Sequence, residues 1–144
     1  MANKTEKPKA EIVIDAENAV VGRLASFAAK KSLNGNAVAI INSEKAKIIG
    51  TPSIIINKYM ARIRLGRGAQ KGPIIRRKPS ELLRRAIRGM IEYKKGKGSE
   101  AFKRIRCYEG VPKLYENKEA ITLPTKEAIK FITLKNLSRH LTGK

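Results

Sequence analysis

Apolar residues in the first third of the chain form two short runs and one stretch of helical spacing. Glu11–Ala16 contains three consecutive apolar residues and predicts a strand, and Ala37–Ile41 is an apolar run typical of a fully buried strand. Between them, apolar residues recur at helical spacing as far as Leu33, with Asn18 as the expected N-cap. A strand, a helix and a strand in this order predict a βαβ unit with a parallel strand pair and a right-handed crossover.

Two helices in the middle of the chain are predicted to begin at prolines. Thr51-Pro52 is a strong helix start, and the helix after it has one apolar and one basic side. Pro79 opens a second helix, which we expect to continue to Tyr93. Its apolar face is formed by Leu82, Leu83, Ala86, Ile87, Met90 and Ile91. The opposite face carries Arg84, Arg85 and Arg88.

Shorter elements are expected in the rest of the chain. Lys94–Gly98 predicts a turn with three lysines, followed by a short helix through Phe102 and Ile105. The remaining segments predict strands at 106–109 and 120–123 and a final helix at 133–141. Together these elements predict an α/β fold that contains a parallel strand pair and long basic loops.

Two segments lack any periodicity. Residues 65–80 mix glycine and proline with Lys and Arg and predict an extended basic loop. The polar residues 1–10 are interpreted as a flexible basic arm, because they lack the apolar region of a secretory signal. We therefore expect a single α/β domain over residues 11–144 and a cytoplasmic location. The longest apolar runs are too short to span a bilayer, and no long helix pairs a basic face with Trp or Phe anchors, so no membrane partner is expected.

Charge is concentrated in one third of the chain. Between Lys58 and Arg106 the sequence has seventeen Lys or Arg residues and three acids, which is +14 of the total net charge of +20. No acid occurs from Lys45 to Ser80. Like charge at this density works against a compact state, so a polyanionic partner is expected, and nucleic acid is the commonest one.

Catalytic chemistry has little support in the sequence. One histidine, His140, and one cysteine, Cys107, provide neither a metal-binding cluster nor a nucleophile with an obvious base. We interpret Cys107 as a small buried apolar residue and His140 as an ordinary surface side chain. The glycine-containing segments lack the spacing of nucleotide-binding loops. No enzyme activity, cofactor, metal or small-molecule substrate is therefore expected.

The choice between RNA and DNA depends on weaker signals. The sequence has no helix-turn-helix, zinc-finger or basic-zipper pattern, and long glycine-rich basic loops suit an irregular folded RNA better than a regular groove. Two alternatives to a structural RNA-binding protein remain open: a free regulatory RNA- or DNA-binding module, and an RNA-modifying enzyme that uses Cys107.

Several blocks of sequence resemble one family. They are Val13–Ala16, Val21–Ser26, Ile40–Lys45 with Ile49-Gly50, Arg85–Met90 and Arg104–Pro112. In this order they resemble the large-subunit ribosomal protein L-thirteen family, and the segment 67–80 is similar to its archaeal and eukaryotic branch. The chain departs from that branch after Met90, where Ile91-Glu92-Tyr93 stands in place of Leu-Pro-His.

The resemblance implies a three-layer α/β domain with a small, mainly parallel sheet and long basic loops. It also implies a structural constituent of the large ribosomal subunit that binds ribosomal RNA and supports subunit assembly. The implied partners are large-subunit ribosomal RNA and neighbouring large-subunit proteins. The expected RNA-binding residues are Arg62, Arg64, Arg67, Lys71, Arg76, Arg77, Arg84, Arg85, Arg88, Lys94, Lys95, Lys97, Lys103 and Arg104. The resemblance supports the basic helix face and the lysine turn, whereas the loop residues are included mainly for their charge.

Overall fold

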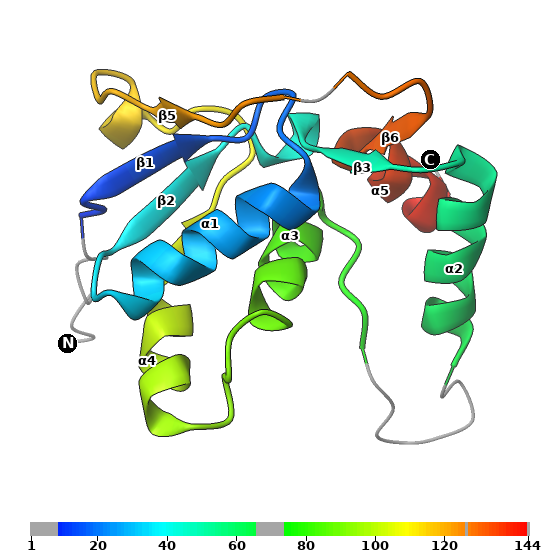
Figure 1. Ribbon diagram of the computed structural model, residues 1–144. Coiled ribbons are helices and arrows are strands. Elements are labelled where there is room, and N and C mark those ends of the chain that lie inside the picture. Colours follow the sequence, from blue (N-terminus) through cyan, green and yellow to red (C-terminus); the bar gives the residue numbers. More distant parts are fainter. Residues whose placement is uncertain (1–8, 66–73, 126, 144) are drawn as a thin grey trace, which may run out of the picture.

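The computed structural model describes residues 9–65, 74–125 and 127–143 (Figure 1). The elements in chain order are β1 (Ile12–Asp15), α1 (Val21–Leu33), β2 (Val38–Ile41), the 3₁₀ turn η1 (Ser43–Lys45), β3 (Lys47–Ile49), α2 (Pro52–Arg64), α3 (Pro79–Arg88), α4 (Gly96–Arg104), β4 (Ile105–Cys107), the 3₁₀ turn η2 (Lys113–Tyr115), β5 (Ile121–Thr122), β6 (Phe131–Thr133) and α5 (Leu134–Thr142). No helix in the described ranges is long and apolar enough to cross a membrane.

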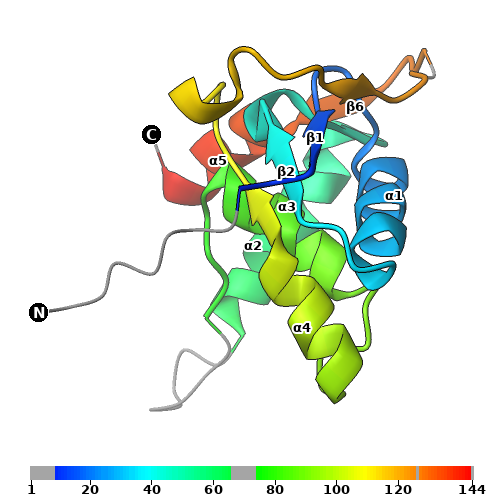
Figure 2. The same cartoon turned by 90° about the vertical axis from the view of Figure 1, so that its left-hand side faces the viewer.

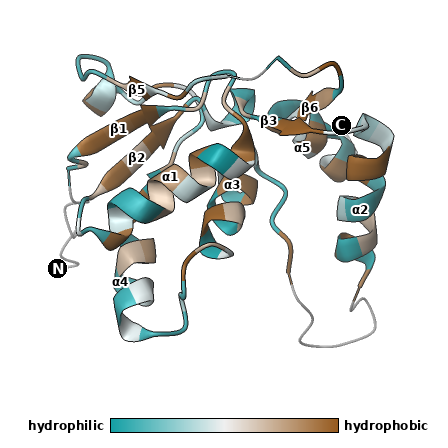
Figure 3. Cartoon of the chain, in the orientation of Figure 1, coloured by the Kyte–Doolittle hydropathy of each residue, from teal (hydrophilic) through white to brown (hydrophobic). Residues whose placement is uncertain are grey.

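A four-stranded parallel sheet with the order β4-β2-β1-β5 organises the fold. β1 and β2 pair in parallel, with Ile14 opposite Ile40, which confirms the predicted βαβ unit. All four residues of β2 are buried, as expected for a central strand that is covered on both faces. The hydropathy colouring in Figure 3 shows the apolar strands beside helices with mixed surfaces.

The two faces of this sheet have different cores. Ile14 and Ile40 point into the larger core, which the buried sides of α1, α3 and α5 complete. Val13 and Ile41 point to the other face, where Tyr115 of η2 covers them. Figure 2 shows η2 and α1 on opposite sides of the sheet. The architecture is therefore mixed α/β, with a helical layer, a mainly parallel sheet and a thinner layer around η2.

A second sheet, which the sequence did not predict, consists of β3 and β6 in antiparallel pairing. It leads into α5, whose N-cap Thr133 accepts a hydrogen bond at its Oγ1 from the Asn136 backbone N–H at 3.3 Å. Leu134, Leu137 and Leu141 of α5 are buried in the main core, as their spacing predicted. α2 has no buried residue and packs against α5 by its half-buried apolar side.

Several predicted boundaries were wrong. α1 begins at Val21 after Val20, and Asn18 lies earlier in a turn with a φ of 59°. α3 ends at Arg88 rather than Tyr93, so Met90 is 47% exposed instead of lying on the apolar face. The expected 94–98 turn contains the start of α4, which begins at Gly96. The strand predicted at 106–109 is β4, which begins and ends earlier, at Ile105 and Cys107.

Candidate nucleic-acid interface

Three arginines of α3 are held at one side of the helix by its buried face. Leu82, Leu83 and Ile87 are buried in the main core, so the residues between them face away from it. Arg84, Arg85 and Arg88 are half-buried rather than extended into solvent. They line a hollow of about 370 Å³, together with Ile74, Arg76, Glu81 and Phe102. The structure thus brings four of the predicted site arginines together at one concave surface.

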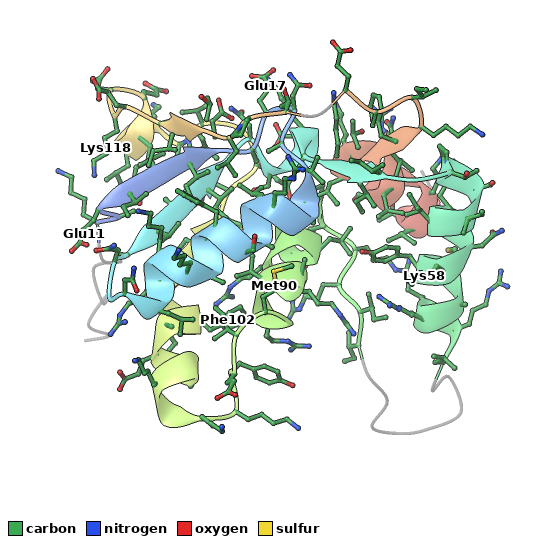
Figure 4. All side chains as sticks on the ribbon, in the orientation of Figure 1. Glu11, Glu17, Lys58, Met90, Phe102 and Lys118 are labelled. Atoms are coloured by element: carbon green, nitrogen blue, oxygen red, sulfur yellow. The ribbon has the colours of Figure 1, made fainter. Side chains whose placement is uncertain are left out.

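Aromatic rings position two of these guanidinium groups. The Arg84 guanidinium carbon lies 4.4 Å from the centre of the Phe102 ring, and that of Arg88 lies 4.9 Å from the Tyr93 ring. Figure 4 shows Phe102 near α3, at the end of α4 that leads into β4. Arg76 forms the ion pair of this hollow, with Nη1 at 3.4 Å from Oε1 of Glu81. Within the described residues, Arg85 and Arg88 have no carboxylate partner.

A second hollow of about 230 Å³ adjoins the first, because Arg84 lines both. Arg106 of β4 enters this second hollow beside Cys107 and Tyr108. The Nε atoms of Arg84 and Arg106 are buried and have no hydrogen-bond partner in the described part of the chain. Burial lowers the pKa of Arg84, and the nearby positive charge of Arg106 lowers it further. Arg106 was absent from the predicted site.

The basic residues of α2 form a separate group. Arg62 is exposed, and its guanidinium carbon lies 5.6 Å from the Tyr59 ring. Arg64 and Arg77 line a hollow of about 290 Å³ at the end of α5. The backbone carbonyl of Arg77 accepts a hydrogen bond from Ser138 Oγ at 2.7 Å, which ties the segment before α3 to α5. The predicted residues Arg67 and Lys71 lie outside the described residues.

The lysines around α4 are exposed and differ in their contacts. Lys95 pairs with Glu92 at 2.9 Å, whereas Lys94, Lys97 and Lys103 form no ion pair in the described ranges. Arg104 is bound within the fold: its Nη1 lies 3.4 Å from the Ser32 carbonyl oxygen, and its Nη2 lies 3.9 Å from Glu100. Arg104 is therefore less free to bind a partner than its neighbours.

Of the two residues weighed for catalysis, Cys107 is half-buried, where full burial was predicted, and packs against the main core. Burial raises the pKa of the Cys107 thiol to about 12, so it stays protonated at neutral pH and is a poor nucleophile. His140 is exposed in the last turn of α5. Among the described residues, no group of three or more His, Cys, Asp or Glu side chains could hold a metal ion.

Comparison with known protein families identifies the family to which this chain belongs. Residues 9–114 match the family described as ribosomal protein L13. The chain belongs to this family. Its members are structural, non-enzymatic components of the ribosome, which confirms the expectation that the chain is not an enzyme.

Relatives from archaea cover nearly the whole chain. The Methanopyrus kandleri large ribosomal subunit protein uL13 is 40% identical over 96% of this chain and 91% of its own length. The proteins of the same name from Methanocaldococcus jannaschii and Methanococcus maripaludis are 43% and 39% identical, each over 92% of this chain and 98% of its own length. These relatives agree with the archaeal and eukaryotic branch that the 67–80 segment suggested.

Proposed function

We propose that this L13-family chain binds ribosomal RNA of the large subunit and supports the assembly of that subunit. The observation that carries the proposal is the convergence of Arg84, Arg85 and Arg88 on one hollow in which Glu81 is the one acid. An external phosphate would supply a counter-charge for these half-buried arginines, which have no carboxylate partner among the described residues. Phosphate satisfies a guanidinium with two parallel hydrogen bonds.

The shape of the basic surface favours folded RNA over a regular duplex. The α3–α4 residues and the Arg64–Arg77 pair lie at different hollows on different elements. In Figure 1, α2, α3 and α4 project to the same side, below the two sheets. Separated basic groups at different heights fit an RNA whose backbone changes direction, whereas a B-DNA groove is usually entered by one helix or ribbon.

The proposal extends to the remaining predicted residues and to the cellular setting. Arg62, Arg76, Lys94, Lys95, Lys97 and Lys103 add phosphate contacts near the hollows described above, and Arg67 and Lys71 add further ones from the segment between α2 and α3. The relatives are named as proteins of the large ribosomal subunit, which supports a site of action on cytoplasmic ribosomes, beside other large-subunit proteins. The proposed organisation is one RNA-binding domain over 11–144 with a basic arm at 1–10.

Sedimentation of cell extracts tests the proposal. The endogenous chain should migrate with the large subunit in moderate salt and leave it at high salt. About 6–10 phosphate contacts would lower the affinity by about three to five orders of magnitude between 50 and 200 mM salt in an isolated complex. Recovery of the chain only in free fractions, under all salt conditions, would refute a ribosomal role.

Crosslinking in intact cells, followed by sequencing of the attached RNA, then separates ribosomal RNA from other targets. Crosslinks to large-subunit ribosomal RNA at peptides from α3 and α4 support the proposal. Crosslinks confined to one short transcript outside the ribosome would instead support a free regulatory module.

A further inference from the structure

The two hollows that share Arg84 differ in chemistry. The larger one combines an aromatic ring, Phe102, with an apolar side chain, Ile74, that is 86% exposed. The smaller one places Arg106 beside Arg84. One surface therefore offers a flat apolar contact and, next to it, a pair of positive charges.

The larger hollow has the properties of a stacking site. Its volume of about 370 Å³ falls at the small end of the range typical of ligand pockets. Phe102 is half-buried, and the Arg84 guanidinium carbon 4.4 Å from its ring centre adds a second flat group. Unstacked RNA bases bind to aromatic rings and guanidinium planes, and a base in this hollow would also cover Ile74.

The smaller hollow is suited to binding an anion, because two arginines line it. Arg84 and Arg106 carry like charges close together, and the buried Nε of each has no partner among the described residues. Glu81 also lines this hollow but is engaged by Arg76, and Glu109 nearby accepts a hydrogen bond from Ser80 Oγ at 3.1 Å. A phosphate in this hollow would accept hydrogen bonds from the guanidinium groups that line it and offset their repulsion.

We propose that the two hollows form a subsite for one unstacked RNA nucleotide, with its base against Phe102 and Ile74 and its phosphate between Arg84 and Arg106. The proposal rests on the proposed RNA binding and adds two things to it. It assigns an RNA-contacting role to Arg106, and it makes part of the affinity depend on a base rather than on charge alone.

A pair of RNA oligonucleotides measures the base contribution directly. The full chain is titrated with a fluorescently labelled single-stranded hexa-adenylate and with a hexamer of abasic ribose phosphates, which has the same number of phosphates. The wild-type chain should bind the base-containing RNA about tenfold or more tightly than the abasic one. The variant Phe102→Ala should reduce this ratio to about twofold, because only the base-containing RNA loses a stacking contact.

Phe131→Ala is the matched control. Phe131 is 37% exposed and has Lys47 Nζ at 4.4 Å from its ring centre, the same separation as for Arg84 and Phe102, but it lies on β6. This variant should keep the wild-type ratio. If Phe102→Ala fails to fold by circular dichroism, Phe102→Leu preserves the apolar volume, removes the aromatic face and should still lower the ratio.

Arg106→Gln tests the phosphate half of the subsite. It should weaken both RNAs by a similar factor, about threefold to tenfold, and reduce the dependence of the logarithm of affinity on the logarithm of salt by about one. The nucleotide proposal is overturned if the wild-type chain binds both RNAs equally, or if Phe102→Ala weakens both to the same extent. If neither RNA binds in a salt-dependent manner, the proposed RNA binding itself fails.

Discussion

The carboxyl end of the parallel sheet and the α3–α4 side differ in how their polar groups are satisfied. In open α/β sheets the carboxyl ends of the strands are the usual ligand site. Here Asp15 Oδ1 at the end of β1 accepts hydrogen bonds from Asn42 Nδ2 at 3.0 Å and from the Glu17 backbone N–H at 2.9 Å. Glu44 Oε2 accepts one from the Gly110 backbone N–H at 3.0 Å. This end of the sheet is largely satisfied by the chain itself.

The α3–α4 side shows the opposite state. The buried Nε atoms of Arg84 and Arg106 have no hydrogen-bond partner. At the sheet end, the buried side-chain atom without a partner in the described ranges is the neutral Ser43 hydroxyl. Figure 4 shows Glu17 at the upper edge of the molecule and Phe102 among the helices below the sheet. The contrast teaches that, within the described residues, the chain largely satisfies its own polar groups at the ends of β1 and β2 but leaves two guanidinium nitrogens without partners beside α3 and β4. Substitutions in the two regions should therefore have opposite consequences.

Charge reversal on α3 should have the largest effect. Replacing Arg84, Arg85 and Arg88 together by Glu removes three phosphate contacts and adds three repulsive charges, so RNA affinity should fall by about a thousandfold or more. The circular dichroism spectrum of the free chain should persist, and incorporation into large subunits should be lost. Filter binding and gradient sedimentation measure the two outcomes.

The control for charge reversal changes the net charge by the same amount elsewhere. Lys30, Lys113 and Lys130 are exposed on α1, on η2 and beside β6. Their replacement by Glu should lower the affinity by less than about tenfold, through long-range charge alone. Equal losses in the two triple variants would show that net charge rather than the α3 hollow governs binding. Loss of the folded spectrum in the α3 variant would show that its arginines are structural.

Gly98→Ala should destabilise the packing of α4 without changing the net charge of the chain. A Cβ on this buried glycine would meet the Glu92 backbone carbonyl closer than any ordinary contact, so α4 would have to shift against the turn before it. We expect a loss of about 2–3 kcal/mol in the free energy of unfolding, measured with urea.

Gly96→Ala provides the comparison for that loss. Gly96 is the first residue of α4, and an added Cβ there has no atom within 4 Å. This variant should stay within about 0.5 kcal/mol of wild type. Similar stabilities for the two variants would mean that α4 is not packed tightly against the preceding turn and can shift to accommodate the added Cβ.

Local patterns were sufficient for the elements that build the sheet. β1 and β2 carry continuous apolar runs because parallel strands are covered on both faces, and this signal needs no knowledge of partners. β3 and β6 escaped prediction because each has three residues and their pairing joins segments far apart in the chain. Apolar periodicity also extended α3 too far: Ile91 is buried, but it is reached through a turn after Gly89.

The charge of the candidate site could be predicted from the sequence, but its concave shape could not. The excess of Lys and Arg between 58 and 106 is visible in the sequence, and so are Arg84, Arg85 and Arg88 as one helix face. The hollow requires Phe102 from α4 beside α3, and Arg106 joins Arg84 only because β4 lies next to α3. Asn18 shows the same limit locally, since Asn is favoured both at N-caps and in the left-handed conformation it adopts here.

Asp15→Ala should lower the stability of the fold and leave RNA affinity nearly unchanged, the reverse of the result expected for charge reversal on α3. Removing this carboxylate deprives the Glu17 N–H and the nearly buried Asn42 amide of their acceptor, which costs about 1–3 kcal/mol in the free energy of unfolding. RNA affinity should stay within about twofold. Glu116→Ala removes the same charge from an exposed position and should change neither quantity appreciably. A larger loss of affinity than of stability would place Asp15 on the RNA side.

Cys107 should give the smallest effect, a pH dependence of stability. Burial holds the pKa of its thiol at about 12 in the folded state, above the ordinary value of about 8.5 in an unfolded chain. The folded state therefore keeps its proton while the unfolded state loses it, so this contribution is present in full below about pH 8.5 and is lost as the pH rises toward 12. Between pH 7 and 9.5 the loss should be about 1 kcal/mol, and Cys107→Ala should remove that part of the decline. If the wild-type chain and the variant decline in parallel, the thiol is more accessible than its position on β4 beside Arg84 implies. The smaller hollow would then be open to water and less able to strengthen the phosphate contact of Arg106.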